Sequence, residues 1–208
     1  MYNFKFHQFL SASTPKCRAK VDVGFILDSS GSLRNEYHKE KDFLKAVANA
    51  FDISADGSRV GVVTFSFNAE HSIKLKDHSD KSSFNAAVDA IPLMGSTTRI
   101  DRALRLTQKE LFAAENGGRK NVPKILVLMT DGSQTADADA EDPGKISEEL
   151  RKAGIELIVL GIGKGVDKEE LDHMAGGKGK AYSAASFDDL INGDFVSKLT
   201  SQSCEAGR

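Results

Sequence analysis

Runs of apolar residues alternate along the chain with segments in which apolar residues recur every three or four positions. Three of the runs, Phe25–Leu27, Ile125–Met129 and Leu157–Leu160, are continuous rather than interrupted by polar residues. Continuous apolar runs are typical of parallel strands that are buried on both faces of a sheet. Together with weaker runs, they predict strands over residues 21–28, 59–66, 71–75, 124–131, 155–163 and 180–183.

The segments between these strands have the apolar spacing of amphipathic helices. Pro92 ends one of them, and Asp142-Pro143 places an N-cap residue before a proline at the first helical position of another. Asp167 and Ser186 begin two sequences that resemble capping boxes. Spacing and caps predict helices over residues 37–51, 84–91, 100–111 and 143–154, one that begins at Asp167, and a final one over residues 186–201.

Strands that alternate with helices indicate βαβ units and a mostly parallel sheet with helices on both faces. The four residues Phe67–Glu70 are too few for a crossover helix, so the strand after them, at 71–75, is expected to be antiparallel and to lie at an edge. We therefore predict an α/β fold, with a doubly wound, mostly parallel six-stranded sheet that has one antiparallel edge strand.

The composition narrows the class of protein. The chain has 208 residues, of which 40% are hydrophobic, and this is enough for one domain with a full core. The formal net charge is -2 with both signs interspersed, so no basic surface for nucleic acid is expected. No apolar stretch approaches the length of a membrane span, so membrane insertion is not expected either.

Two cysteines, Cys17 and Cys204, lie near the two ends of the chain. They are either unrelated thiols or a disulfide that joins the ends of one compact domain, and both readings stay open. Disulfides persist in oxidising compartments, which favours secretion. Residues 1–16 lack the sustained apolar region of a signal peptide, so we interpret them as a flexible leader or as the ragged start of a fragment. The expected boundaries are a leader at 1–16, a domain at 17–204 and a tail at 205–208.

The candidate chemistry begins where the first predicted strand ends. Asp28-Ser29-Ser30-Gly31-Ser32 places a carboxylate and the hydroxyls of Ser30 and Ser32 on a turn of small residues. Gly31 is expected to let the backbone turn tightly enough for both hydroxyls to face one point. Such oxygens suit Mg²⁺, which takes about six oxygen ligands and usually keeps several waters. We expect Asp28 on a solvated rim, where Asp28→Ala weakens metal binding without unfolding the domain.

Two further segments are expected to bring oxygen atoms to the same edge of the sheet. Asp131 ends another strong strand, and Thr98 lies in the loop before a predicted helix. In doubly wound sheets, ligands bind outside the carboxyl ends of the strands, where the strand order reverses. Taken singly, Thr98 also fits a helix N-cap, and Asp131-Gly132 also fits a turn. Their joint placement beside the Asp28 turn predicts a metal site.

These segments, together with Arg59–Ser66 and the strand at 154–163, resemble the von Willebrand factor type A domain, and the resemblance runs from about Val21 to Leu199. It implies a Rossmann-like fold that carries a metal-ion-dependent adhesion site. Mg²⁺ is the implied cofactor, with Mn²⁺ or Ca²⁺ as alternatives. The implied ligands are three hydroxyls in direct contact and two carboxylates that act mainly through water: Ser30, Ser32 and Thr98, and Asp28 and Asp131.

The resemblance also implies a function. Members of this family bind an acidic residue of a protein ligand through the cation, so the chain is expected to be an extracellular adhesion module for collagen or another matrix protein, part of a larger multidomain protein, and not an enzyme. Many extracellular members pair their terminal cysteines, which implies a Cys17–Cys204 disulfide. In integrin relatives the final helix, here 186–201, moves to change affinity. The bridge is expected to tether it and to fix the affinity.

The chain departs from the family pattern in one segment. Thr98-Arg99-Ile100-Asp101 stands where the family often has Thr-x-Thr-Gly. Arg99 and Asp101 are therefore expected to line the ligand rim and to alter the choice of ligand. The stretch from Asp131 to Pro143 is too short for the extra helix of collagen-binding integrin I domains, which places the chain nearer the matrilin–collagen-like matrix branch.

Two other functions stay open. The first is a phosphoryl-transfer or hydrolase enzyme with Asp28 as nucleophile and Mg²⁺ as cofactor. Against it, no lysine or histidine is expected near the rim, because His38 and His173 fall in helices elsewhere. The second is a structural assembly module whose contacts lie away from the metal. The acidic run that begins at Asp137 imitates an EF-hand loop, but its sixth position is Asp142 instead of glycine, so calcium is not expected there.

Overall fold

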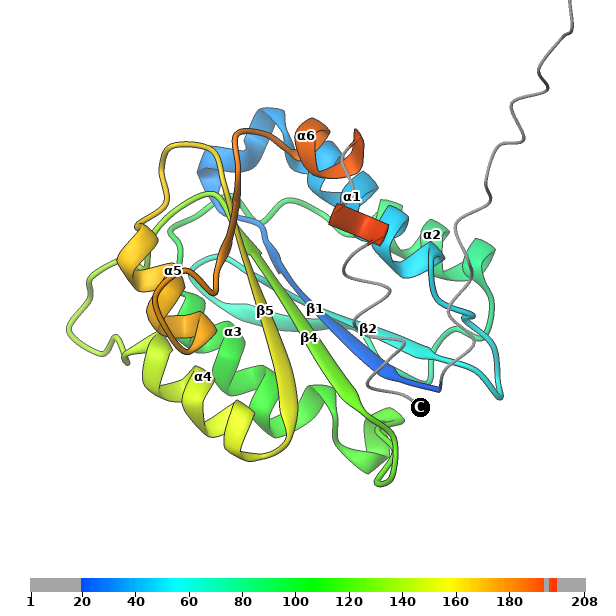
Figure 1. The fold of residues 1–208 in the computed structure, drawn as a ribbon. Coiled ribbons are helices and arrows are strands. Elements are labelled where there is room, and N and C mark those ends of the chain that lie inside the picture. Colours follow the sequence, from blue (N-terminus) through cyan, green and yellow to red (C-terminus); the bar gives the residue numbers. More distant parts are fainter. Residues whose placement is uncertain (1–19, 193–194, 198–208) are drawn as a thin grey trace, which may run out of the picture.

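A computed structural model describes residues 20–192 and 195–197 of the chain, and Figure 1 shows its ribbon. The strands are β1 (Asp22–Asp28), β2 (Arg59–Phe65), β3 (Ala69–Ile73), β4 (Lys124–Thr130), β5 (Ile155–Ile162) and β6 (Tyr182–Ala184). The α-helices are α1 (Tyr37–Asn49), α2 (Lys81–Ala90), α3 (Ile100–Leu106), α4 (Pro143–Lys152), α5 (Lys168–Ala175) and α6 (Phe187–Asn192). Three short helical turns are η1 (Gly31–Asn35), η2 (Thr107–Leu111) and η3 (Ala114–Asn116).

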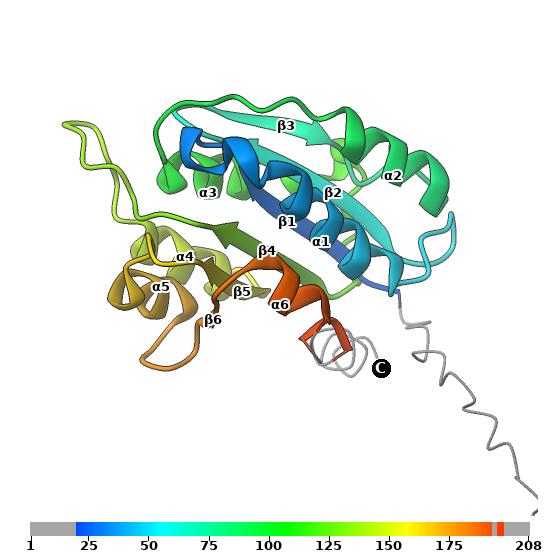
Figure 2. The same ribbon diagram turned by 90° about the horizontal axis from the view of Figure 1, so that it is seen from above.

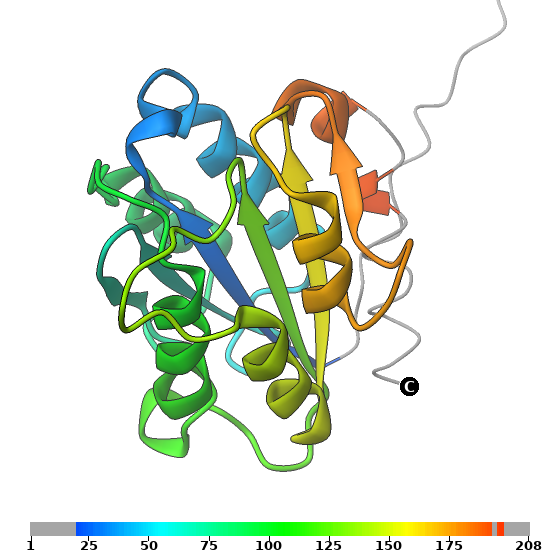
Figure 3. The same ribbon diagram turned by 90° about the vertical axis from the view of Figure 1, so that its left-hand side faces the viewer.

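The six strands form one sheet in the order β3-β2-β1-β4-β5-β6. All neighbouring pairs are parallel except β2 and β3, which are antiparallel with a register shift between Val62 and Val63. The predicted fold class is confirmed, including the antiparallel edge strand. The parallel strands end at one edge of the sheet, where their arrowheads lie together in Figure 3.

Helices cover both faces of this sheet (Figure 1). On one face α1, α2 and α6 contribute Phe43, Phe84 and Phe187 to a core cluster. On the other face α3, α4 and α5 contribute a second cluster that includes Leu104 and Leu150. Helix α1 lies along β1, as Figure 2 also shows. Burial on both faces explains why the central strands are continuously apolar.

The sheet separates at the carboxyl end of β1. The ladder between β1 and β2 runs as far as the pair Asp28–Phe65, whereas the ladder between β1 and β4 stops at Leu27–Met129. The strand order also reverses here, because β2 and β3 lie on one side of β1 while β4, β5 and β6 lie on the other. A crevice at such a reversal is the usual ligand position of open α/β sheets.

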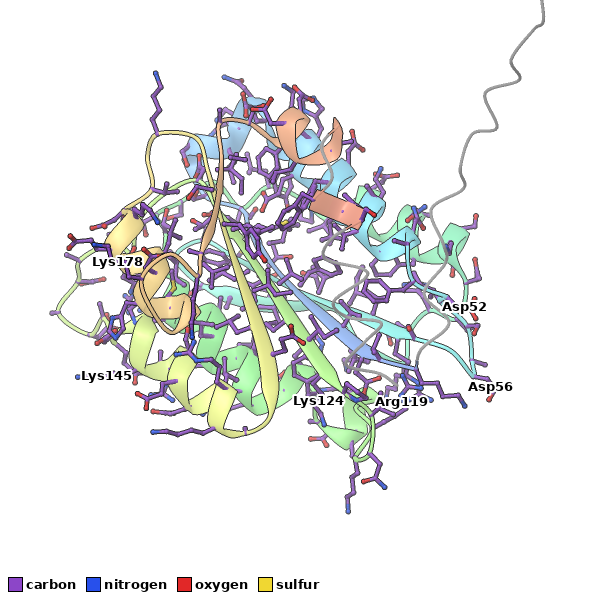
Figure 4. The ribbon with its side chains drawn as sticks, viewed as in Figure 1. Asp52, Asp56, Arg119, Lys124, Lys145 and Lys178 are labelled. Atoms are coloured by element: carbon purple, nitrogen blue, oxygen red, sulfur yellow. The ribbon has the colours of Figure 1, made fainter. Side chains whose placement is uncertain are left out.

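The amino end of β1 is closed by an ion pair. Asp22 is fully buried, and its Oδ1 accepts from Nε of Arg119 at 2.8 Å, while the backbone N–H of Arg119 donates to Oδ2 at 2.8 Å. Figure 4 labels Arg119 and Lys124 at this end of the sheet. The guanidinium therefore neutralises a carboxylate that the core would otherwise hold uncompensated.

Some predicted boundaries differ from the structure. Helix α2 begins at Lys81, because the Asp80 carboxylate accepts the N–H of Ser83 at 2.9 Å and caps it. The predicted helix over 100–111 is α-helical only to Leu106 and continues as a π-helical turn. Cys17 and Cys204 lie outside the described residues, so the disulfide and the domain boundaries stay predictions. Among the residues that the structure describes, no helix is long and apolar enough to cross a membrane.

Candidate metal centre

Asp28 ends β1 with its side chain fully buried. Its Oδ1 accepts the N–H of Ser30 at 2.9 Å, and its Oδ2 accepts the hydroxyl of Thr130 at 2.6 Å. The expectation of a solvated rim is therefore wrong for Asp28, because the turn after β1 folds over the carboxylate and Thr130 closes it from β4. The group is held in one orientation by two hydrogen bonds.

The hydroxyls after Asp28 converge with a residue from another strand. Oγ of Ser30 and Oγ of Ser32 lie 3.0 Å apart, and Ser32 donates to Oδ1 of Asp131 at 2.8 Å. Three of the five predicted metal-site residues thus form one hydrogen-bonded chain across two loops. The conformation does not require the glycine between the serines, since Gly31 is not among the described glycines with positive φ and a Cβ there would meet its nearest atoms at 3.6 Å.

Hydrogen bonds of Ser96 and of Thr98 hold the Thr98 loop at the same edge. The Gly31 N–H donates to the Ser96 carbonyl at 2.8 Å, which ties the Thr98 loop to the β1 turn. Thr98 N–H donates to Oγ1 of Thr135 at 3.1 Å, and the Thr135 N–H donates to the Thr98 carbonyl at 2.8 Å. Oγ1 of Thr98 lies 3.7 Å from where a Cβ on Gly132 would stand. The hydroxyl therefore lies over the residue that follows Asp131.

Thr98 is not the N-cap of the helix after it. The N-cap position of α3 is Arg99, and no side chain there caps a backbone N–H. The alternative interpretation of Thr98 as a helix cap is wrong, and its hydroxyl stays available as an oxygen ligand.

Glu40 is a residue of this region that the sequence analysis missed. It lies on α1, is fully buried, and its Oε1 accepts the N–H of Asp28 at 3.0 Å. A signal was present, because Glu40 occupies a position three after Tyr37 and four before Leu44, on the face of α1 that faces the core. A carboxylate at a buried position of an amphipathic helix needs an explanation beyond packing.

Burial raises the pKa of the carboxyl groups in this region. Burial raises the pKa of Asp28 to about 6, although hydrogen bonds from Thr130 and Ser30 act in the opposite direction. Burial also raises the pKa of Asp131, and burial together with the neighbouring Asp28 raises the pKa of Glu40 well above its usual range. Within residues 20–192 and 195–197, no lysine or arginine forms an ion pair with Asp28, Glu40 or Asp131.

Arg99 and Asp101 lie beside the site but not at its surface. They are 1% and 2% exposed, and the guanidinium donates twice to the carboxylate, at 2.9 and 2.8 Å. Arg99 also donates to Asp137 at 3.1 Å and to Asp139 at 2.8 Å, in the loop after β4. Burial opposes ionisation of Asp101, but the Arg99 and Gln134 hydrogen bonds outweigh it and hold its pKa at about 2.

This burial differs from the expected ligand rim. The loop after β4 covers Arg99 and Asp101, so neither side chain has appreciable surface to offer a ligand. Asp137 and Asp139, which begin the EF-hand-like run, are paired with Arg99 instead. Arg99 follows Thr98 directly, so these ion pairs tie the loop after β4 to the Thr98 segment.

The donor set fits a hard divalent cation. Within the described part of the chain, no three His, Cys, Asp or Glu side chains gather as a metal group, so the oxygen-rich character of this site comes from serine and threonine hydroxyls. Neutral hydroxyls beside carboxylates that lack a cationic side chain suit Mg²⁺, Mn²⁺ or Ca²⁺ rather than a soft metal. The residues that would hold the cation are Ser30, Ser32, Thr98, Asp28 and Asp131.

A hollow of about 220 Å³ adjoins this cluster and is lined by Ser32, Asp131 and Lys164, among others. Lys164 follows β5 and comes from the same edge of the sheet as the candidate ligands. The expectation that no lysine lies near the rim is therefore wrong. Lys164 is exposed and forms no ion pair with Asp131 among the described residues.

Comparisons with known proteins agree with this fold. The family profile described as "von Willebrand factor type A domain" matches residues 22–197. The chain is 31% identical to matrilin-3 of Mus musculus over 76% of this chain and 33% of matrilin-3. It is 32% identical to the collagen alpha-6(VI) chain of Mus musculus over 92% of this chain and 8% of the collagen. It thus spans a third or less of these relatives.

A solved structure resembles the whole described fold. Proximal thread matrix protein 1 from the mussel byssus, in a form with a zinc-occupied MIDAS (metal-ion-dependent adhesion site) motif, is 27% identical with a TM-score of 0.78. The match covers 91% of this chain and 48% of that one. In that similar protein, a divalent cation occupies the motif to which the hydroxyl cluster here corresponds by resemblance.

Proposed function

Because this chain belongs to the von Willebrand factor type A domain family, as the sequence predicted, we propose that it binds a divalent cation and captures a carboxylate of a matrix protein through it. The observation that carries the proposal is the hydrogen-bonded chain of Ser30, Ser32 and Asp131, with the Thr98 loop tied to it. Three loops distant in sequence bring hard oxygen donors to one edge of the sheet, and in the described residues no lysine or arginine forms an ion pair with Asp28 or Asp131.

The side chains at this site have two proposed roles. Ser30, Ser32 and Thr98 are proposed as direct ligands, since their hydroxyls are neutral and already lie at this edge. Asp28 and Asp131 are proposed to act mainly through water; Thr130 and Ser30 already hold the two Asp28 oxygens. When bound, a divalent cation with neutral ligands keeps enough positive charge to accept a carboxylate oxygen in place of a water.

The partner and the setting follow from the same proposal. We propose Mg²⁺ as the cation, with Mn²⁺ or Ca²⁺ as alternatives, and collagen or another extracellular matrix protein as the ligand. The chain is proposed to be a secreted, non-enzymatic module of a larger protein, closed by a Cys17–Cys204 disulfide. The matches to a matrilin, to a collagen chain and to a byssal matrix protein support this setting. Arg99 and Asp101 are proposed to act indirectly, by holding the loop next to Thr98.

The test is binding of the chain to immobilised matrix proteins in Mg²⁺ and in EDTA. We expect binding in Mg²⁺, its loss in EDTA and its recovery when Mg²⁺ is added back. Ser32→Ala should weaken binding at least tenfold, because it removes one ligand and the hydrogen bond to Asp131. Ser82→Ala, on α2 away from the site, is the matched control and should bind as the wild type does.

Two results would contradict the proposal. Equal capture of matrix protein in EDTA would mean that the contacts lie away from the metal, as in an assembly module. Turnover of phosphate esters that depends on Mg²⁺ and is lost in Asp28→Asn would instead indicate an enzyme.

A further inference from the structure

Two exposed basic side chains lie beside the candidate metal centre and have no part in the capture of a single carboxylate. Arg34 lies in η1, two residues after Ser32, and Lys164 lies two residues after the end of β5. Both are exposed, and among the residues that the structure describes neither forms an ion pair. Charged groups at the rim of a binding site steer the encounter with a ligand and select among ligands.

The loop that carries Lys164 packs against the residue that follows β4. A Cβ on Gly165 would lie 2.5 Å from the carbonyl oxygen of Asp131, so any larger residue there would clash with the backbone. Gly163 has φ +83°, a conformation that favours glycine, and its N–H donates to the Ala184 carbonyl at 2.9 Å. The loop is therefore held from two sides, and Lys164 lines the hollow of about 220 Å³ together with Asp131.

Arg34 lies next to a different segment of the site. Its Nη2 is 3.7 Å from where a Cβ on Gly95 would stand, in the loop that leads to Thr98. The N–H of Gly95 donates to the Ser29 carbonyl at 2.8 Å, which holds this loop against the serine turn. One basic side chain thus lies beside the Thr98 loop, and the other, Lys164, lies beside the carboxylate segment after β4.

The hollow beside Lys164 has a mixed lining. Leu33, Ile162 and Phe187 are its buried apolar residues, and Glu36 is an exposed acidic one. Apolar residues suit the methylene groups of a glutamate side chain, and the lysine suits its carboxylate. Glu36 opposes an acidic ligand, so its removal should have the opposite effect to the removal of the lysine charge.

We propose that Arg34 and Lys164 select a ligand segment with several acidic residues in succession, of which the cation holds one and the two bases attract its neighbours. This inference rests on the proposed function and names the class of partner, an acidic peptide segment. An extended peptide advances about 3.3 Å per residue, so the acidic residues next to the bound one lie within reach of long side chains. Because solvent screens exposed ion pairs, each base is expected to contribute about two- to fivefold in affinity.

The experiment measures binding of the full chain to two immobilised synthetic peptides by surface plasmon resonance in Mg²⁺. One peptide is Gly-Gly-Glu-Glu-Glu-Gly-Gly and the other is Gly-Gly-Ser-Glu-Ser-Gly-Gly, both with blocked termini, so that they differ only in the residues beside the central glutamate. We expect the wild type to bind the three-glutamate peptide at least about fourfold more tightly. This preference should shrink when NaCl is raised from about 0.05 to about 0.3 M, because salt screens the added pairs.

Single substitutions assign the preference to particular charges. Lys164→Gln and Arg34→Gln should each lower it by about two- to fivefold, and Lys164→Arg should keep it, because the charge remains. Glu36→Gln should raise it by about twofold, since it removes a charge of the opposite sign. Lys178→Gln is the matched control and should leave the preference unchanged, since Lys178 is an exposed lysine between α5 and β6, labelled in Figure 4.

Calorimetric titration with Mn²⁺ alone separates an effect on the ligand from damage to the metal site. Each variant should bind Mn²⁺ within about threefold of the wild type, because none of the substituted residues is a proposed metal ligand. A preference that is unchanged in both Lys164→Gln and Arg34→Gln, or one that falls only in step with Mn²⁺ affinity, would overturn the inference and leave the proposed function in place. A wild type that binds neither peptide in Mg²⁺ would overturn the proposed function itself.

Discussion

Asp22 and Asp28 begin and end the same strand, are both fully buried, and differ in what compensates their charge. Asp22 is bound by the guanidinium of Arg119, whose Nη2 also lies 2.7 Å from Oδ1. Asp28 is bound by a hydroxyl and a backbone N–H, which are dipoles without net charge. One end of β1 is electrostatically complete within the described protein, and the other is not.

The difference separates a structural ion pair from the candidate metal site on one strand. A buried carboxylate with its own arginine contributes to the fold and needs no ligand. A buried carboxylate beside neutral hydroxyls and further carboxyl groups, and without a basic partner, is expected to be stabilised when a cation binds. The amino end of the sheet is therefore expected to respond to mutation through stability, and the carboxyl end through metal.

The largest expected effect comes from breaking the Asp22–Arg119 ion pair at the amino end of β1. Arg119→Met leaves Asp22 buried without its cation, and we expect the free energy of unfolding to fall by about 3–5 kcal/mol. Urea denaturation in the presence and in the absence of Mg²⁺ measures it. The loss should be the same in both, because the ion pair lies at the far end of β1.

The double variant Asp22→Asn/Arg119→Met is the control for this prediction. It removes both charges, so it should be more stable than Arg119→Met alone. If Arg119→Met costs less than about 1 kcal/mol, water or another group satisfies Asp22 and the contrast between the two ends is lost.

The second prediction makes one substitution at each end of β1. The wild type should gain about 2.7 kcal/mol at a Mg²⁺ concentration one hundred times its dissociation constant. Asp28→Asn should lose this gain while its metal-free stability changes by about 1 kcal/mol or less. Asp22→Asn should lose about 2 kcal/mol with or without Mg²⁺ and keep the full gain from the metal.

Thermal unfolding of the three proteins across a Mg²⁺ series tests this pair. An Asp28→Asn protein that is stabilised by Mg²⁺ as much as the wild type would show that Asp28 is not part of the metal site. A gain lost in both variants would show that the two ends are coupled rather than independent.

The third prediction concerns pH in the metal-free protein. Because burial raises the folded pKa of Asp28 to about 6, the fold favours its protonated form, and the stability that this provides is present at low pH and lost as the pH rises through about 6. We expect unfolding in EDTA to require about 1 kcal/mol more at pH 5 than at pH 7 from Asp28 alone. Asp101, whose folded pKa is about 2, is ionised throughout this window and does not oppose the trend.

Saturating Mg²⁺ should remove this dependence or reverse it, because a cation stabilises the ionised carboxylates. Chemical denaturation at the two pH values, with EDTA or with Mg²⁺, makes the measurement. Equal stability at pH 5 and pH 7 in EDTA would contradict the conclusion that the charge of Asp28, at the end of β1, is uncompensated in the metal-free protein.

The fourth prediction has the smallest expected effect and serves as a control for the other three predictions. Glu148 and Lys152 form an ion pair at 2.7 Å on α4, with side chains 57% and 73% exposed. Glu148→Gln should change the free energy of unfolding by about 0.5 kcal/mol or less, because solvent already screens the pair. A larger loss would mean that charge changes on this domain act through general electrostatics and not through the particular partners of Asp22 and Asp28.

Most of the fold could be predicted from local pattern. Continuous apolar runs identify strands buried on both faces, and the short Phe67–Glu70 link excludes a crossover, so the antiparallel edge followed from length alone. The register shift at Val62–Val63 and the π-helical turn Thr107–Leu111 were not predicted. Both depend on how one element meets another, and neither leaves a mark in the spacing of apolar residues.

The site was predictable where its residues lie at strand ends. Asp28 and Asp131 follow apolar runs, and the hydroxyls follow Asp28 at fixed spacing. The positions of Arg99 and Asp101 were not predictable, because the loop that covers them comes from residues more than thirty positions away. The burial of Asp28 depends on Thr130 in the same way. Glu40 could be recognised in the sequence as an acidic residue on the apolar face of a helix, once the edge with the candidate metal site was known.

The register shift between β2 and β3 has a consequence at the margin of the sheet. A flat outer strand offers its backbone groups to other molecules, and such edges lead to aggregation and fibrils. Here one margin is irregular and carries the exposed Glu70, and the opposite margin, β6, is only three residues long. Neither edge strand is a good template for another chain. The domain should therefore stay free of edge-to-edge sheet association at high protein concentration.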